Sequence, residues 1–409
     1  MTQTPPRLPL KLLKLTAPSA DDLWEADTCQ KWFEHQGKSN SSCTALNFSE
    51  EEQSRSQIQD VLRKVWTDLR PPRSLTDFGT TNLIHILIRR IWDAPWYTDN
   101  PKDPWSQYKP HESISMGYPA VIPSFSKWRN GTCDCLDVLH WEALSFSAKA
   151  GGLEGPVFLQ LHLARLLLLT PVKKLFSHVQ AKSRRYASNS LLPHDLYDVP
   201  DPDSECRQTL ITWAKKDRHK ARLAVIHAGA IFWHVRRYSS DSFAQSFAVF
   251  LAAITLWAYG TFSQMSFPTL HVMDEPSPAT VEGHEQQPNA TSAPNHNLPG
   301  VSPTSMSINS SSSPNASTEV ILSLPTSVTN RRRMPNFIQL DRPVDDELVQ
   351  HFIRDGEGIT LYLEGVEDLC SDQGSKQVLK EAILILNEAK NIWSIAENYI
   401  VCLHGVVGS

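Results

Sequence analysis

The chain has 409 residues, of which 41% are hydrophobic and 12 are tryptophan, and its formal net charge at pH 7 is -5. This length and apolar content predict a globular protein of two or three structural units with a sizeable core. The mild acidity argues against a chain whose main task is phosphate binding, since nucleic-acid-binding domains are usually strongly basic. The 7 cysteines are odd in number and scattered, and we expect no signal peptide, so reduced thiols are predicted.

Apolar residues recur with a helical period in the first quarter of the chain. One set has the i, i+3, i+4, i+7, i+11 spacing of a helix face: Ile58, Val61, Leu62, Val65 and Leu69. A second set continues on the next segment: Leu83, Leu87 and Ile91. No comparable run alternates with a period of two, so the sequence predicts an all-α fold.

Further helices are predicted towards the C-terminus. Pro156 and Pro171 bracket a short apolar segment that we expect to form a helix buried on most sides, with proline in its first turn. Another helix is expected from Asp217 to Arg237. One long C-terminal helix is predicted from an apolar stripe: Leu379, Ala382, Ile383, Leu386, Trp393 and Ile400.

No charged side chain occurs from Phe243 to Pro268, a stretch long enough to cross a bilayer. Polar residues interrupt it, and Ser242 with Gln245 matches a capping box, which is typical of soluble helices. Gly260 is expected to end the helix. We therefore interpret this segment as the central helix of a large α-helical core, and a single membrane span is the alternative.

Composition divides the chain into three parts. Pro, Ser, Thr and Asn dominate residues 273–333, which are too polar to offset the entropy of ordering and are predicted to be a disordered insert. We expect a helical domain at 1–270, the insert at 271–335 and a helical continuation of the same domain at 336–405. Two further stretches are predicted to be irregular connections: residues 94–118 and 182–204.

Histidine and cysteine residues offer weak evidence for a metal site. Cys133, Cys135 and His140 would supply three ligands, whereas structural zinc takes four, so ordinary buried thiols beside a helix start are the favoured interpretation. His227 and His234 lie seven residues apart on one predicted helix, without the spacing of a metalloprotease pair. We interpret both as core or partly exposed imidazoles, and we expect no metal and no cofactor in this chain.

Motifs for enzymatic chemistry are missing from the sequence. We find no nucleophile elbow, phosphate-binding loop or dinucleotide fingerprint. The acidic residues 345–347 sit where carboxylates favour a helix N-terminus, which is enough to explain them. We therefore predict that the chain is not an enzyme, and a helical enzyme without a recognisable motif remains an alternative.

Two basic clusters are candidates for an import signal or a phosphate contact. One is the segment Lys215–Arg222, which crowds a predicted helix start, and the other is Arg331, Arg332 and Arg333 at the end of the predicted insert. Short basic runs are frequent and usually only solvated. We select Arg331, Arg332 and Arg333 as the nuclear-import candidate, because an import receptor could reach them in a disordered segment.

Several blocks resemble the fungal-specific transcription factor domain, the helical regulatory region of many fungal zinc-finger regulators. They are Leu15–Phe33 with its acidic-Leu-Trp-Glu-Ala core, Ala221–Gly260, and Phe337–Gly356 continuing to the helix through Trp393. The similarity covers most of Leu12–Cys402 except the predicted insert. It lies in the order and spacing of the blocks and includes no catalytic motif.

The resemblance implies an all-α regulatory domain in the nucleus that controls transcription by RNA polymerase II through co-regulators or self-association, without membrane contact. An effector pocket is a further option, for which no residue can be named from the sequence. Family members carry a DNA-binding zinc module, and nothing of that cysteine spacing occurs here, so DNA binding and zinc are implied for the family alone. We expect this chain to be a fragment, a shortened product or an incomplete gene model that lacks the N-terminal part of the domain.

Overall fold

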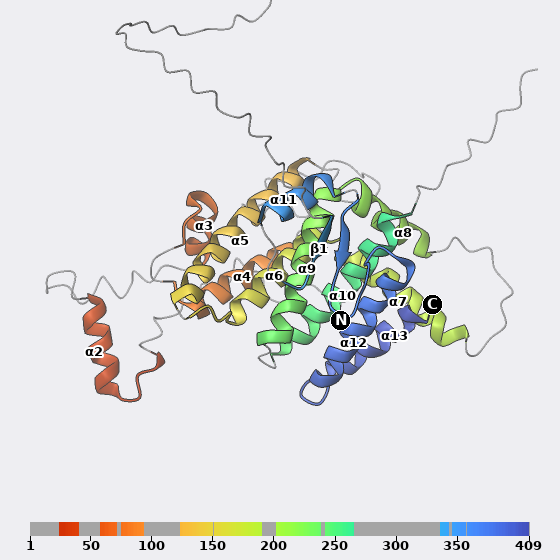
Figure 1. The fold of residues 1–409 in the computed structure, drawn as a ribbon. Coiled ribbons are helices and arrows are strands. Elements are labelled where there is room, and N and C mark those ends of the chain that lie inside the picture. Colours follow the sequence, from red (N-terminus) through yellow and green to blue (C-terminus); the bar gives the residue numbers. More distant parts are fainter. Residues whose placement is uncertain are drawn as a thin grey trace, which may run out of the picture. The chain divides into compact units, whose positions relative to one another are not determined.

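The computed structural model describes residues 24–40, 58–71, 75–93, 123–149, 151–189, 202–238, 242–265, 336–342, 346–356 and 358–408. These residues form 12 helices and two short strands, which confirms the all-α fold class (Figure 1). They belong to one compact unit, built from the chain before residue 268 and after residue 333. The predicted insert at 273–333 and the irregular stretch at 94–118 lie outside the described residues.

The helices follow the chain in this order: α2 (Cys29–Asn40), α3 (Ile58–Asp68), α4 (Asp77–Asp93), α5 (Pro123–Lys149), α6 (Pro156–Leu169), α7 (Val172–Asn189), α8 (Pro202–Lys215), α9 (Arg218–Tyr238), α10 (Phe243–Ser263), α11 (Asp346–Asp355), α12 (Asp372–Ala389) and α13 (Ile395–Val407). The strands β1 (Phe337–Gln339) and β2 (Thr360–Tyr362) pair in parallel, with Ile338 opposite Leu361. The sequence analysis missed both strands, since three residues are too few to show alternation.

Helix α10 is the centre of the core. Every residue from Ala248 to Gly260 is buried, and α10 contacts α6, α7, α8, α9, α12 and α13. Among the described helices α10 alone is long and apolar enough to cross a membrane, yet 83% of its most apolar window is buried inside the protein. The prediction of a central core helix is therefore confirmed, because the apolar surface of α10 is covered by other helices.

Both predicted ends of α10 need correction. Gly260 does not end the helix, which continues to Ser263. The glycine is needed for packing instead, because a Cβ atom there would lie 2.3 Å from the carbonyl oxygen of Leu369. Ser242 is the N-cap residue, but its side chain makes no capping hydrogen bond, so the predicted capping box with Gln245 is not formed.

The helices around α10 follow the predicted patterns closely. Helix α6 begins with Pro156, ends before Pro171 and is buried on nearly all sides. Helix α3 buries its predicted face except for Leu69, which lies beyond the helix end with a φ of 50° and is 46% exposed. Helix α9 begins one residue after the predicted start at Asp217. Helix α7 extends through residue 189, so the predicted irregular stretch at 182–204 begins as helix.

The C-terminal stripe forms two helices rather than one. Helix α12 ends at Ala389, and the chain turns before α13 begins at Ile395. The stripe residue Trp393 therefore lies in the turn, where it meets Phe243 with ring centroids 5.6 Å apart. Because α12 and α13 fold back on each other, both pack on α10. A single continuous helix would carry the second half of the stripe away from the core.

Candidate functional site

One face of α9 carries three contacts to the chain that follows residue 335. Arg222, Gly229 and Arg236 are spaced seven residues apart, so they share a face of the helix. Arg222 is buried and donates hydrogen bonds of 3.2 Å to the carbonyl oxygens of Ile353 and Arg354 at the end of α11. The positive guanidinium thereby satisfies the last carbonyls of α11 and complements its dipole.

The middle contact is a close approach of two backbones. A Cβ atom on Gly229 would lie 2.3 Å from the carbonyl oxygen of Leu340, directly after β1. Gly356 is constrained in the same way, because its Cβ atom would lie 2.9 Å from the Arg222 guanidinium. Glycine at both positions lets α9 pack tightly on the strand and helix that follow the predicted insert.

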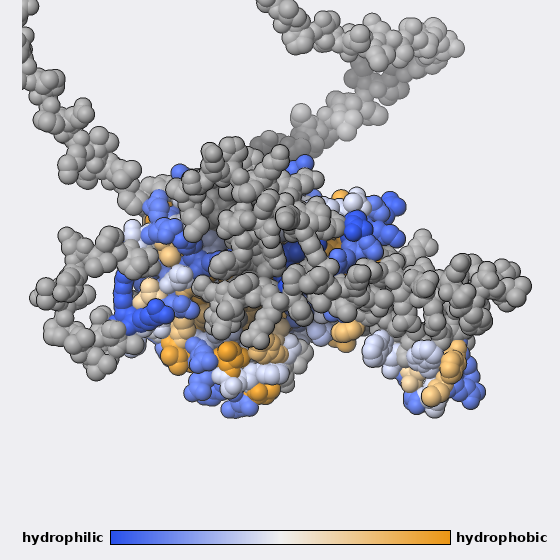
Figure 2. Space-filling model, turned by 180° about the vertical axis from the view of Figure 1, so that it is seen from behind, coloured by the Kyte–Doolittle hydropathy of each residue, from blue (hydrophilic) through white to orange (hydrophobic). Residues whose placement is uncertain are grey.

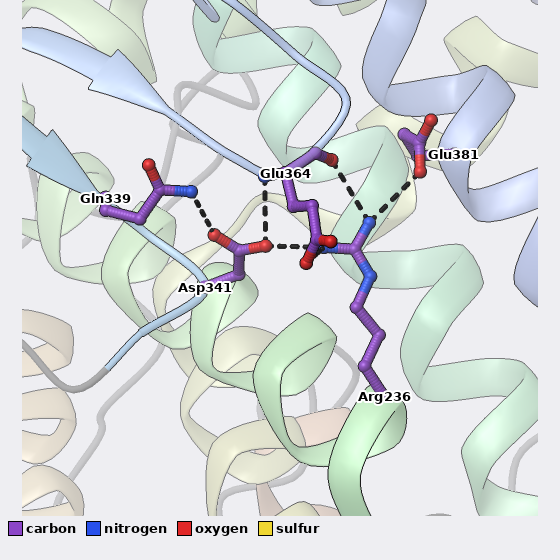
Figure 3. Close-up of polar contacts among 5 residues, drawn as sticks. All are labelled: Arg236, Gln339, Asp341, Glu364 and Glu381. Carbon is purple, nitrogen blue, oxygen red and sulfur yellow. Dashed lines mark hydrogen bonds and ion pairs between the residues drawn. The ribbon is translucent and has the colours of Figure 1, made fainter.

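Arg236, at the end of α9, is the centre of a polar junction that we define as Arg236, Gln339, Asp341, Glu364 and Glu381 (Figure 3). Its Nη1 donates to Oδ2 of Asp341, and its Nη2 donates over 3.1 Å to both the Glu364 carbonyl oxygen and Oε2 of Glu381. The junction thus joins α9 to β1, β2 and α12.

Asp341 is the most buried member of the polar junction, with 4% of its surface exposed. Besides Arg236, it accepts hydrogen bonds from the Gln339 amide at 2.6 Å and from the Glu364 backbone N–H at 3.0 Å. A buried carboxylate is tolerated when a positive charge and several donors surround it. The polar junction is accordingly a structural ion-pair network.

Within the segment Lys215–Arg222 the fold uses one basic residue and one acidic residue. Arg222 holds α11, and Asp217 accepts two hydrogen bonds from buried Arg129 of α5, at 2.6 and 3.1 Å. The predicted phosphate contact is therefore not available at Arg222, whose guanidinium lies against the carbonyls of α11. The import candidates Arg331, Arg332 and Arg333 lie outside the described residues.

Three imidazoles from α5, α6 and α9 form a second polar group, which we call the imidazole cluster: His140, His162 and His227. The rings of His140 and His162 are 5.4 Å apart, and those of His162 and His227 are 5.3 Å apart. Nδ1 of His162 lies 3.1 Å from Nδ1 of His227, and Arg165 Nη1 lies 3.3 Å from Nε2 of His227. Arg165 also donates to Asp137.

The hydrogen bonds assign the protons of the cluster. Arginine only donates, so Nε2 of His227 accepts from Arg165, and the ring proton of His227 sits on Nδ1. That proton points to Nδ1 of His162, which therefore accepts. Burial, with the Arg165 charge nearby, lowers the pKa of His140 to about 4 and the pKa values of His162 and His227 well below their usual range. All three rings are neutral at pH 7.

The cysteine pair near His140 lacks the arrangement of a metal site. Cys133 and Cys135 lie in the middle of α5 rather than at a helix start, and burial raises the pKa of Cys135 to about 12. Within the described residues, no three His, Cys, Asp or Glu side chains converge as metal ligands. The cysteines described do not fit the zinc module that the resemblance implies, which needs four converging ligands for each metal ion.

His234 is separate from the imidazole cluster although it lies on the same helix as His227. Its Nδ1 lies 3.0 Å from Oε2 of Glu154, in the connection before α6, and its side chain is buried. Of the two predicted alternatives, core or partly exposed imidazoles, the structure shows the core one, since His227 and His234 are both buried. The sequence analysis missed His162 and Arg165, although two polar residues three apart within the apolar run of α6 were a usable signal.

No protein-family model, curated protein or solved structure matches this chain. The resemblance to the fungal-specific transcription factor domain stays a prediction.

Proposed function

We propose that this chain is the regulatory domain of a fungal transcription factor that controls transcription by RNA polymerase II in the nucleus. The observation that carries the proposal is the packing of two resembling blocks on each other. Ala221–Gly260 supplies nearly all of α9 and α10, and Phe337–Gly356 supplies β1 and α11. Arg222, Gly229 and Arg236 connect the two blocks along one face of α9.

This packing supports the resemblance, because it brings the resembling blocks together in space. Blocks that resemble one family in order and spacing also form one contiguous part of the core, although a long segment separates them in the sequence. A regulatory domain of this kind acts by presenting a folded surface to other proteins. DNA would be bound only through a zinc module that these residues do not contain. The net charge of -5 agrees with this, because a chain that itself binds DNA is usually strongly basic.

The described surface offers apolar side chains for protein contacts. Trp141 and Leu144 on α5 are 74% and 46% exposed, and Leu153 after α5 is 67% exposed. On one face of the molecule, hydrophobic residues lie exposed among hydrophilic ones (Figure 2). Aromatic side chains such as that of Trp141 are enriched at protein interfaces, which supports co-regulators or self-association as the partners.

A reporter assay tests the proposal. The chain is fused behind a heterologous DNA-binding module, and we expect the fusion to change reporter transcription by several fold relative to the module alone. Without the module, the purified chain should bind duplex DNA no better than non-specifically, with a Kd of about 10⁻⁴ to 10⁻⁶ M or weaker. Nanomolar, sequence-selective binding in a mobility-shift titration would contradict the proposed division of labour.

Two matched fusions control for folding. Ala253→Asp places a charge in the buried centre of α10, whereas Ala148→Asp places the same charge on an exposed site of α5. The first fusion should lose the effect on transcription and the second should keep it, at equal protein abundance on an immunoblot. If the wild-type fusion is well expressed and does not change reporter transcription, the proposed function is wrong.

A further inference from the structure

The C-terminal half of α5 has an exposed apolar surface. One side of α5 packs on α3, α4 and α6 and is buried at Cys135, Leu136, Leu139 and Ala143. The opposite side is exposed, with Trp141 at 74%, although tryptophan is usually covered in folded proteins. We define the α5 surface as half-buried Glu142 and the exposed residues around it: Trp141, Leu144, Ser145, Ala148, Lys149 and Leu153.

Leu153 belongs to this surface because the turn after α5 is tied to the helix. The Ser147 hydroxyl donates a hydrogen bond of 2.9 Å to the Leu153 carbonyl oxygen, and the Gly152 N–H donates over 2.8 Å to the Ser147 carbonyl oxygen. Gly151 and Gly152 allow this turn with φ values of 80° and 85°. The α5 surface is therefore preformed, and little ordering entropy is lost when a partner covers it.

The charges on the α5 surface show which partner fits it. Glu142 and Lys149 are seven residues apart, so they lie on the same flank of α5. Neither of them forms an ion pair with another described residue. When two identical helices pack antiparallel about a two-fold axis, equal flanks face each other, and Glu142 of each copy would face Lys149 of the other. A parallel pair would bring like charges together instead.

We propose that the α5 surface binds a second copy of this chain, with the two α5 helices antiparallel about a two-fold axis near Phe146. Leu144 and Ala148 lie two residues on either side of Phe146, so Leu144 of each copy meets Ala148 of the other. Glu142 and Lys149 lie about 6 Å and 4.5 Å from the axis along the helix, which brings the two opposite charges level within about 1.5 Å.

The remaining residues of α5 agree with this arrangement. Trp141 of each copy lies over the end of the partner helix, where Leu153 supplies an apolar contact. The exposed acidic residues Asp134 and Asp137 are about 13 Å or more from the axis, on opposite ends of the dimer, so they do not repel each other. One helix thus supplies the aromatic side chain, the apolar site that it covers and both members of the ion pair. A second copy satisfies all of them.

Sedimentation equilibrium of the full chain measures the association. We expect a reversible equilibrium between monomer and dimer with a Kd on the order of 10–100 µM, because one helix and a turn bury less surface than a standard interface does. A wild-type chain that stays monomeric up to about 500 µM would overturn the proposal.

Two tryptophan variants assign the association to the α5 surface. Trp141→Ala should raise the Kd about tenfold or more, because a tryptophan in the contact contributes a large share of the binding energy. Trp24→Ala removes a side chain of similar exposure, 70%, outside the α5 surface and should leave the Kd unchanged. Equal Kd values for Trp141→Ala and the wild type would overturn the proposal.

A charge exchange tests the antiparallel arrangement. Glu142→Lys and Lys149→Glu should each raise the Kd about three- to tenfold, because each variant turns two attractive pairs into repulsive ones. The double variant should restore the wild-type Kd. A double variant that dimerises no better than the single variants would contradict this pairing. Circular dichroism melting curves confirm that the variants are folded.

The use of this dimer in transcription rests on the proposed function, whereas the association itself does not. Ala148→Asp separates the two, because it places a carboxylate of each copy near the axis and should raise the Kd about tenfold or more. The same variant should keep its effect on the reporter, since the fold is unchanged. A monomeric wild type with an active fusion would overturn only the dimer. A wild-type dimer with an inert fusion would overturn only the proposed function.

Discussion

Helices α9 and α10 have the same length of 21 residues and lie side by side in the core, but they are buried in different ways. Helix α10 has no charged residue and is covered by apolar side chains. Helix α9 buries Arg222, His227 and His234, and each of them needs a polar partner from another part of the chain. Helix α10 is thus stabilised by the burial of apolar surface. Helix α9 is stabilised in addition by specific polar contacts.

This difference explains what each helix contributes. Apolar burial is non-directional, so α10 can be covered by any well-packed set of helices. The contacts of α9 are directional, because a guanidinium or imidazole is satisfied only by an acceptor or donor in the right place. Helix α9 therefore fixes which segments pack on it, including β1 and α11 from beyond the predicted insert.

The largest expected effect comes from giving α10 a charge. Ala253 is fully buried, so Ala253→Asp places a carboxylate in the core without a partner, and the free energy of unfolding should fall by several kcal/mol or the domain should not fold. Ala148→Asp on the exposed end of α5 should cost less than about 1 kcal/mol, mainly through the helix dipole. Thermal unfolding followed by circular dichroism measures both. Equal melting temperatures would contradict the core assignment of α10.

Removing a partner of α9 should have a smaller but still large effect. Asp341→Ala leaves Arg236 without its buried counter-charge and leaves the Glu364 N–H without its acceptor, so we expect a loss of about 3 kcal/mol. Glu364→Gln is the matched control in the same junction, because that side chain is 73% exposed and its pair with Arg236 spans 3.6 Å. It should cost at most about 1 kcal/mol.

Urea unfolding measures the free energy of unfolding of Asp341→Ala, Glu364→Gln and the wild type. Similar midpoints for Asp341→Ala and the wild type would show that the polar junction does not stabilise the fold, and α9 would then depend on apolar burial as α10 does. A loss of more than about 1 kcal/mol in Glu364→Gln would show that the exposed Glu364 carboxylate stabilises the fold more than a surface ion pair normally does.

The same contrast explains how much of the structure was predictable from the sequence. The position and burial of α10 followed from its lack of charge, and the buried face of α3 followed from the spacing of Val61, Leu62 and Val65. These are local patterns. The end of α10 was wrong because Gly260 packs against Leu369, which is more than a hundred residues away in the sequence. A glycine pattern alone does not distinguish a helix end from a close contact.

The polar sites were harder to predict for a related reason. A buried arginine or histidine looks the same in the sequence as an exposed one, and its partner lies at no fixed spacing. Asp341, His162 and Arg165 were therefore missed, whereas His227 and His234 were recognised only as candidates for the core. The repeat of seven between Arg222, Gly229 and Arg236 was visible, and it would have identified the polar face of α9.

At neutral pH the smallest expected effect is that of the imidazole cluster, whose contribution to stability changes only as the pH falls. The pKa values of His140, His162 and His227 are lowered in the folded protein, so these rings bind fewer protons than in the unfolded chain. Stability should therefore be highest above about pH 6.5 and decrease as the pH falls towards 4, by up to about 1.4 kcal/mol per pH unit for each ring that stays neutral. His227→Gln should remove one such contribution.

Neighbouring charges decide how this prediction is measured. Arg165 faces the cluster from α6, and Glu154 and His234 also act on it, whereas Asp137 and Cys133 act on Arg165. Burial raises the pKa of Asp137, which opposes the histidines because the folded state then binds an extra proton. The informative quantity is thus the difference in pH slope between His227→Gln and the wild type from pH 7.5 to 4.5. His219→Gln, at an exposed position, should keep the wild-type slope. If His227→Gln and His219→Gln both keep the wild-type pH slope, the buried His227 imidazole does not take up a proton on unfolding in this pH range. That result would contradict the prediction.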